Sequence, residues 1–138
     1  MPESRTESSP DARPLVVCID DDAVVEPVFR AAAERAGARA LFVGRPEQFR
    51  QALLEMSPAG AVLDQVMPES TGAELVMWMR SLPKPPAVIV IGSDPLYLQS
   101  SAILVQRAGL ELAGSLQKPL DLKEFARIIS DLIGRRSA

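Results

Sequence analysis

Short apolar runs alternate along this chain with longer stretches in which apolar residues recur at helical spacing. The apolar runs predict strands buried on both faces, at 15–19, 39–43, 61–63, 87–91 and 112–116. The longer stretches predict helices at 23–36, 46–56, 72–82, 95–107 and 121–133. Strands and helices in strict alternation predict an α/β fold, a single doubly wound five-stranded parallel sheet with helices on both faces.

Two of the predicted helices carry further signals. The last one has a one-sided apolar stripe and begins after Asp121, a good N-cap residue. The helix over 95–107 has apolar residues on more than one face, among them Leu96, Tyr97 and Ile103. Some of these side chains are therefore expected at the surface, where they would suit a partner.

Composition limits the domain organisation and the chemistry. Residues 1–13 are polar and predict a disordered tail, which leaves one domain over 14–136. A net charge of −3 without a basic run argues against nucleic acid or an anionic membrane as a direct partner. The chain has no apolar run near the length of a spanning helix and its start does not look like a leader, so we expect a cytoplasmic location.

Two residue types limit the chemistry further. The single cysteine, Cys18, lies inside an apolar run and is expected to be buried and inert. Histidine is absent, which excludes Ser-His-Asp and Cys-His catalysis and histidine-bound zinc. Carboxylate, hydroxyl and lysine chemistry remain.

Polar residues follow the predicted strands at the points where they end. Asp20, Asp21 and Asp22 follow the first strand and Asp64 the third, Gly92 and Ser93 follow the fourth, and Lys118 and Pro119 follow the fifth. The carboxyl ends of parallel strands share one edge of the sheet, and ligands bind there. Each residue alone could be a helix cap, a turn residue or a solvated charge. Their occurrence at successive strand ends favours a common site.

The predicted site would gather carboxylates around a lysine. Carboxylates about 5 Å apart repel by roughly 3 kcal/mol at an effective dielectric constant near 20. Asp20, Asp21 and Asp64 together would therefore favour a divalent cation, and oxygen ligands open to water suit Mg²⁺. A carboxylate beside a cation and Lys118 can attack a phosphoryl group, and the Ser93 hydroxyl could hold one of its oxygens.

In these motifs the chain resembles the receiver domain of response regulators, over about residues 14–134. The similarity rests on the acids in VVCIDDDA, on LDQVMPESTG with Asp64, Met67, Pro68 and Gly72, and on the Lys118-Pro119 pair in SLQKPL, which is usually a cis bond in that family. The resemblance implies a (βα)5 flavodoxin-like fold. It also implies Mg²⁺-dependent transfer of a phosphoryl group to Asp64, the metal being bound by Asp21, Asp64 and the Val66 carbonyl, with Asp20 assisting through water.

The resemblance also implies partners. A sensor histidine kinase or a phosphotransfer protein would supply the phosphoryl group. An output domain or protein would contact the surface formed by 95–107, 112–116 and 121–133, where a homodimer could also form. The chain would then be a signalling module of a two-component system, not an enzyme beyond its own phosphorylation and dephosphorylation. A weaker similarity, around AGLELAGSLQKPL, is to receivers joined to cyclic-di-GMP phosphodiesterase (EAL) domains.

Two positions depart from the family pattern. The family has Thr or Ser where this chain has Gly92, with Ser93 one place later, and an aromatic residue where it has Ser115. Either Ser93 replaces the hydroxyl or the hydroxyl is missing. These departures leave open a degenerate receiver that acts only as an interaction module.

A phosphatase of the haloacid-dehalogenase type is a further alternative. Asp20 would be the nucleophile and Asp22 the acid, with Ser93 and Lys118 in supporting motifs. That family also needs an acidic pair on a strand after the lysine, and the acids that follow here are predicted on a helix. It would leave Asp64 without a role.

Overall fold

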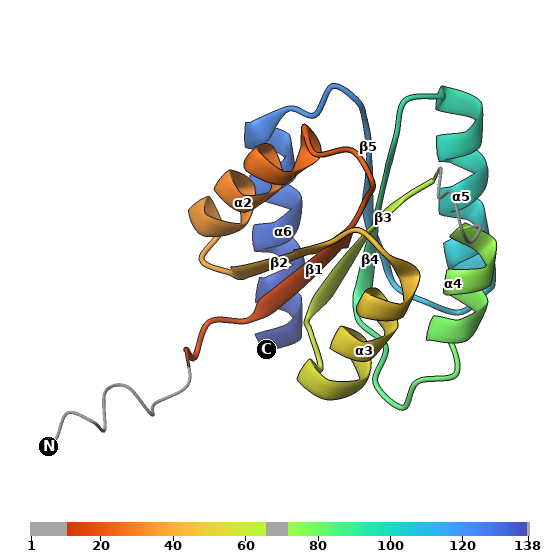
Figure 1. Ribbon diagram of the computed structural model, residues 1–138, viewed down its shortest axis with the longest axis horizontal. Coiled ribbons are helices and arrows are strands. Elements are labelled where there is room, and N and C mark those ends of the chain that lie inside the picture. Colours follow the sequence, from red (N-terminus) through yellow and green to blue (C-terminus); the bar gives the residue numbers. More distant parts are fainter. Residues whose placement is uncertain (1–10, 66–71, 138) are drawn as a thin grey trace, which may run out of the picture.

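The computed structural model describes residues 11–65 and 72–137, and its centre is a parallel sheet. The strands are β1 (Leu15–Ile19), β2 (Arg39–Val43), β3 (Gly60–Asp64), β4 (Ala87–Gly92) and β5 (Leu112–Gln117). Their order in the sheet is β2-β1-β3-β4-β5, and each neighbouring pair is parallel (Figure 1). The chain thus changes direction across the sheet between β1 and β3, and ligand sites of open α/β sheets lie at such a point.

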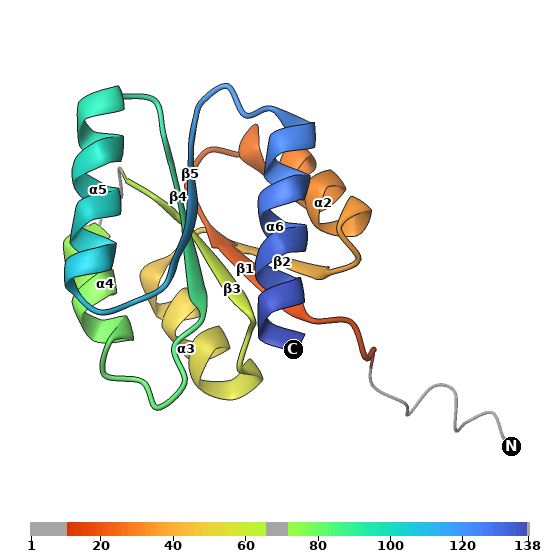
Figure 2. The ribbon, with the colours of Figure 1, turned by 180° about the vertical axis from the view of Figure 1, so that it is seen from behind.

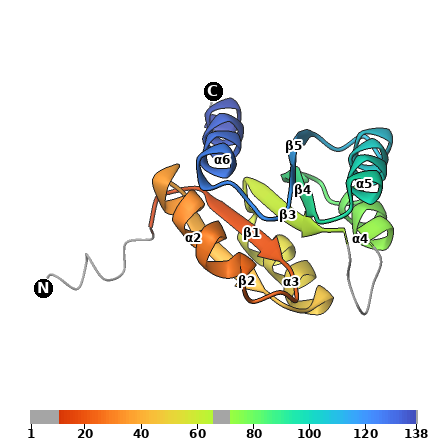
Figure 3. The same cartoon turned by 90° about the horizontal axis from the view of Figure 1, so that it is seen from above.

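Helices cover both faces of the sheet. They are α2 (Val25–Arg35), α3 (Pro46–Met56), α4 (Gly72–Met79), α5 (Pro95–Arg107) and α6 (Leu122–Ser137). Helices α2 and α6 pack on one face, and α3, α4 and α5 lie on the other (Figures 2 and 3). The doubly wound parallel sheet predicted from the sequence is therefore confirmed.

Alternation along the strands divides the core into two. Successive side chains of a strand point to opposite faces. Accordingly Val62 packs with the α2–α6 side, while Leu63 and Val90 pack with the side of α3, α4 and α5. All five residues of both β1 and β3 are buried, because helices cover both faces.

The predicted helices agree with the structure except near their ends. The helix over 46–56 and the one over 95–107 are confirmed with the predicted bounds. Helix α4 ends at Met79, three residues before the predicted end, and α6 continues four residues beyond Ile133. Asp121 caps α6 as predicted, since its Oδ2 accepts a hydrogen bond from the Glu124 N–H at 2.9 Å.

Helix α5 presents apolar side chains to the surface. Leu96 is 74% exposed, Tyr97 64% and Ile103 45%, which confirms that α5 presents apolar side chains to the surface. Residues 1–10 lie outside the described residues, so the predicted tail stays a prediction. Within the described ranges, no helix combines the length and apolar character needed to cross a bilayer.

Candidate functional site

Three charged side chains meet at the carboxyl edge of the sheet. The Lys118 ammonium lies 3.0 Å from Asp20 Oδ2, and it donates a hydrogen bond of 3.4 Å to Asp64 Oδ2. The side chains of Asp20 and Asp64 are 0% and 5% exposed and that of Lys118 is 17% exposed. Two carboxylates buried this far require such a counter-charge.

The backbone fixes these side chains at neighbouring strand ends. The Asp20 N–H donates to the Val43 carbonyl at 3.2 Å, which extends the pairing of β1 with β2 past the end of β1. Asp64 is the last residue of β3. The Lys118 N–H donates to the Gly92 carbonyl at 2.9 Å, which holds the lysine beside β4, and the Lys118–Pro119 bond is cis as the resemblance implied.

Burial alters the acid–base properties of this group. It raises the pKa of Asp20 to about 6, and the neighbouring Asp64 carboxylate adds to the rise while Lys118 opposes it. Burial alone would lower the pKa of Lys118, but the ion pairs with Asp20 and Asp64 raise it above its usual value. The lysine is therefore a permanent cation at neutral pH, and the Asp20 carboxylate takes up a proton at a higher pH than an ordinary aspartate does.

The acids of the first loop form a cluster with Asp64. Asp20, Asp21 and Asp64 each present a carboxylate oxygen, and these oxygens lie within 4.8 Å of one another. Asp20 Oδ1 accepts a hydrogen bond from the Asp22 N–H at 2.9 Å. Asp20 Oδ2 is buried, and within the described residues it accepts no well-aligned hydrogen bond despite its contact with Lys118. This oxygen has capacity left for a further cationic ligand.

The end of β4 is different, because a neighbouring side chain fills the space that a side chain at position 92 would take. A Cβ placed on Gly92 would overlap the Gln65 side chain from Cγ to Oε1. Both polar atoms of the Gln65 amide are buried, and they have no hydrogen-bond partner in the described part of the chain. A buried polar group in this condition costs about 1–3 kcal/mol. Sequence reasoning singled out Gly92 but missed Gln65.

Ser93 and Ser115 lie at the surface. Ser93 is exposed and lines a cleft with Asp22, Lys118 and Pro119, and its carbonyl accepts a hydrogen bond from Gln117 Nε2 at 3.3 Å. Ser115 lies in β5, also exposed, beside Val90 in the register. Val66, predicted to offer its carbonyl to a metal, lies outside the described residues, as do Met67 and Pro68.

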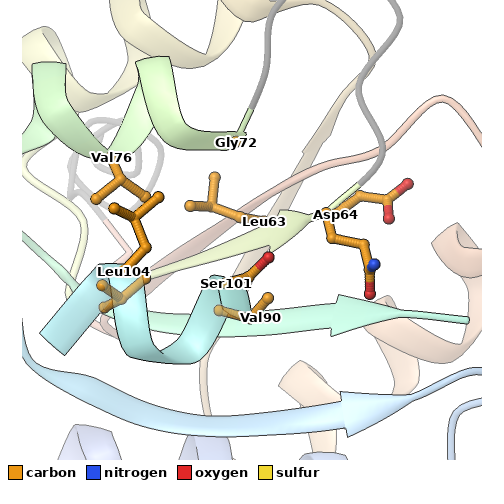
Figure 4. Close-up of a pocket in the computed structure, with 9 residues that line it drawn as sticks. Leu63, Asp64, Gly72, Val76, Val90, Ser101 and Leu104 are labelled. Carbon is orange, nitrogen blue, oxygen red and sulfur yellow. The ribbon is translucent and has the colours of Figure 1, made fainter. Parts of the chain in front are cut away.

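A small cavity of about 20 Å³ lies behind Asp64. Figure 4 shows Val76 of α4 and Leu104 and Ser101 of α5 around it, with Asp64 at its edge. Gln65 also lines this cavity, together with residues of α4 and α5. Cys18 lies elsewhere in the core, where burial raises its thiol pKa well above the usual range, as expected for an inert cysteine.

A doubly wound parallel sheet with a group of acids and a lysine at its carboxyl edge is the arrangement expected of a receiver domain. The model of the response regulator receiver domain family matches residues 16–130, and the chain belongs to that family. The transcriptional regulatory protein GltR of Pseudomonas aeruginosa is 30% identical over 122 residues. The match covers 87% of this chain and 49% of GltR, so the chain spans about half the length of that relative.

Solved structures show the same fold. The chain is similar to a response regulator receiver protein from Pseudomonas putida, with a TM-score of 0.73, 24% identity, and coverage of 88% of this chain and 99% of the other. A response regulator from Colwellia psychrerythraea gives a TM-score of 0.75 and 21% identity, over 90% and 99%. The family assignment favours the receiver over the phosphatase alternative. The structure agrees, since Lys118 is followed by α6 and not by a strand with an acidic pair.

Proposed function

We propose that this receiver accepts a phosphoryl group on Asp64 and relays that event through a change in conformation. The observation that carries the proposal is the position of Asp64. Its carboxylate lies at the end of the central strand β3, in hydrogen-bond contact with Lys118 and beside the carboxylates of Asp20 and Asp21. These neighbours supply what an attacking carboxylate needs, a fixed cation and a place for a metal.

The transfer is a displacement at phosphorus. A carboxylate oxygen of Asp64 forms a new P–O bond as the P–N bond of a phosphohistidine breaks, and the departing nitrogen keeps the bonding electron pair. With acetyl phosphate a P–O bond breaks and acetate leaves. Lys118 holds its charge beside the phosphoryl oxygens in both cases, which lowers the energy of the transition state.

The residues present fit a divalent cation. Asp20, Asp21 and Asp64 would hold it, because they offer only oxygen ligands and Asp20 Oδ2 still has the capacity to accept one. Mg²⁺ bound there would neutralise charge on the transferring oxygens. Val66 remains a proposed ligand through its carbonyl.

Partners follow from the proposed chemistry. A histidine kinase or a phosphotransfer protein would approach the cleft lined by Asp22, Val24 and Ser93, which opens onto Lys118. An output domain or protein would respond to the face of α5, β5 and α6, where Leu96 and Tyr97 are exposed. We place this exchange in the cytoplasm, where the kinase domain and its ATP reside.

A second candidate is an interaction module that needs no phosphorylation. Gly92 and Ser115 support it, because position 92 lacks the hydroxyl of the family pattern and position 115 lacks its aromatic side chain. The two candidates differ in one respect that can be measured directly, the uptake of a phosphoryl group.

The deciding experiment is incubation with Mg²⁺ and acetyl phosphate, read by intact mass. We expect one base-labile phosphoryl group on the wild type and none on Asp64→Asn. Asp131→Asn is the matched control, because Asp131 is an exposed aspartate on α6 that forms an ion pair with Arg127 on the same helix. Label on Asp64→Asn at the wild-type rate would refute the assignment, and an unlabelled wild type would favour the interaction module.

A further inference from the structure

The side chain of Gln65 lies over Gly92, the last residue of β4, which has no side chain of its own. Asp64 pairs with Ile91 in the β3–β4 register, and the Gln65 N–H donates to the Ile91 carbonyl at 3.0 Å. Gln65 therefore lies beside Gly92. Alternation places both on the face that carries Leu63 and Val90.

The described residues give the Gln65 carboxamide no hydrogen-bond partner, although its polar atoms are buried beside a charged site. Its nitrogen and oxygen are buried, and the described residues give neither a partner. Buried amides are nearly always hydrogen-bonded, so an exception is expected where a ligand supplies the missing group. The residue before it in the chain is Asp64, whose carboxylate is the proposed acceptor of a group with three strongly accepting oxygens.

We infer that Gln65 is a phosphoryl-positioning residue, whose Nε2–H donates to a phosphoryl oxygen on Asp64 from the space left by Gly92. This inference rests on the proposed function. Lys118, Asp20 and Asp21 lie against the Asp64 carboxylate. The Gln65 amide lies over Gly92 at the end of β4 and would add a second side-chain donor to that of Lys118. A side chain at position 92 would meet the amide, and the end of the Gln65 side chain would have to shift.

The test compares the rate of phosphorylation and the lifetime of the aspartyl phosphate in variants of the full chain. Gln65→Met keeps the bulk over Gly92 and removes the donor, so a role in filling space alone predicts no change. We expect phosphorylation by phosphoramidate to slow by about 10- to 100-fold, the range for losing one hydrogen bond to a charged group. Mg²⁺ affinity, measured by calorimetry, should stay unchanged.

Two further variants test whether the donor can be moved from β3 to the neighbouring strand β4. Gln65→Ala removes the amide and should slow phosphorylation as Gln65→Met does, and it serves if Gln65→Met does not fold. Gln65→Ala/Gly92→Thr then places a hydroxyl in the vacated space, and we expect it to regain most of the lost rate. A double variant no faster than Gln65→Ala would contradict the shared position.

The outcomes separate this inference from the proposed function. A labelled wild type with Gln65→Met labelled at the same rate overturns the role of Gln65 and leaves Asp64 as the acceptor. A wild type that takes no label from phosphoramidate overturns the proposed function and this inference with it.

Discussion

Two groups of polar side chains flank Asp64, and they are stabilised differently. In the first group, the carboxylates of Asp20 and Asp64 meet the ammonium of Lys118, which compensates one of their two negative charges. In the second group, the buried polar atoms of the Gln65 amide lie over Gly92, and the described residues offer them no hydrogen-bond partner. The first group is held together by its ion pairs, whereas in the second the Gln65 Nε2–H would gain an acceptor in a phosphoryl oxygen on Asp64. The difference suggests that one side prepares the site and the other side senses its occupation.

Removing Lys118 should have the largest effect on the first group. Lys118→Met leaves two buried carboxylates without their counter-charge and removes the fixed cation from the transferring oxygens. We expect phosphorylation by acetyl phosphate to slow by about 10²- to 10³-fold, the effect of deleting one preorganised group that stabilises charge. Rates from intact mass, with Lys123→Met as the exposed control, would decide. A loss below threefold would contradict the proposed role.

Removing an exposed acid should weaken the cation site while the ion pairs persist. Asp21→Ala takes one of three carboxylates from the cluster, and we expect Mg²⁺ affinity to fall by about tenfold or more, at least the loss seen when supporting groups of a metal site are removed. Calorimetry gives the affinity directly. Asp22→Asn is the matched control one residue along, and equal affinities of Asp21→Ala and wild type would exclude Asp21 as a ligand.

Adding a methyl group at Gly92 should sharpen the comparison on the other side. Gly92→Ala places a Cβ where the Gln65 amide lies, so the end of this flexible side chain must shift, and we expect the free energy of unfolding to fall by about 1 kcal/mol, the low end for overpacked sites. In a Gln65→Ala background the same change should cost far less. Urea unfolding of the four proteins measures this coupling, and additive effects would show that the two residues do not share space.

The raised pKa of Asp20 predicts a pH effect in metal-free protein. The folded state holds this proton up to about pH 6, whereas the unfolded state releases it near 3.8. The associated stability is thus fully present below pH 3.8 and is lost as pH rises through 6. We therefore expect the free energy of unfolding of Asp20→Asn, measured in EDTA, to rise relative to that of the wild type as the pH goes from 4 to 7. The expected relative gain is roughly 1–2 kcal/mol after allowance for screening by nearby water. A constant difference across that range would contradict the pKa assignment.

The smallest effect is expected in the signalling face. Beryllofluoride with Mg²⁺ should shift the backbone amide resonances of α5 and β5, because the Gln65 amide lines the cavity that Ser101 and Leu104 border. Without an aromatic residue at Ser115 the change must pass through packing and backbone, and we expect a coupling of about 1 kcal/mol, the low end for allosteric proteins. Shifts confined to residues near Asp64 and Lys118 would show that 95–117 does not carry the signal.

Much of this molecule could be predicted from its sequence because the informative residues act through simple rules. Apolar runs gave the strands nearly to the residue, and charges at strand ends identified Asp20, Asp64 and Lys118 as neighbours. Helix ends were harder: α6 continues through Gly134 because its last turns are held by Arg135 and Arg136, which pair with Glu111. That contact is between segments distant in sequence, and no local pattern contains it.

Gln65 illustrates a second limit. A glutamine after a strand carries no signal by itself, and a glycine at a strand end reads only as a missing hydroxyl. Their relation depends on the β3–β4 register, which places Gln65 beside Gly92 across the sheet. Sequence reasoning recognises groups whose charge or polarity determines their role. It misses a side chain whose role depends on the space that a neighbour leaves empty.

The pairing of Gln65 with Gly92 also restricts the order in which mutations can accumulate. A side chain gained first at position 92 would overlap the glutamine and lower stability, whereas a shortening first at position 65 leaves room for it. The effect of a side chain at position 92 thus depends on the residue at position 65, a case of epistasis built from one steric contact. A lineage moving from this arrangement to a hydroxyl at position 92 would lose stability if position 92 changed first and, on the role inferred for Gln65, phosphorylation rate if position 65 changed first.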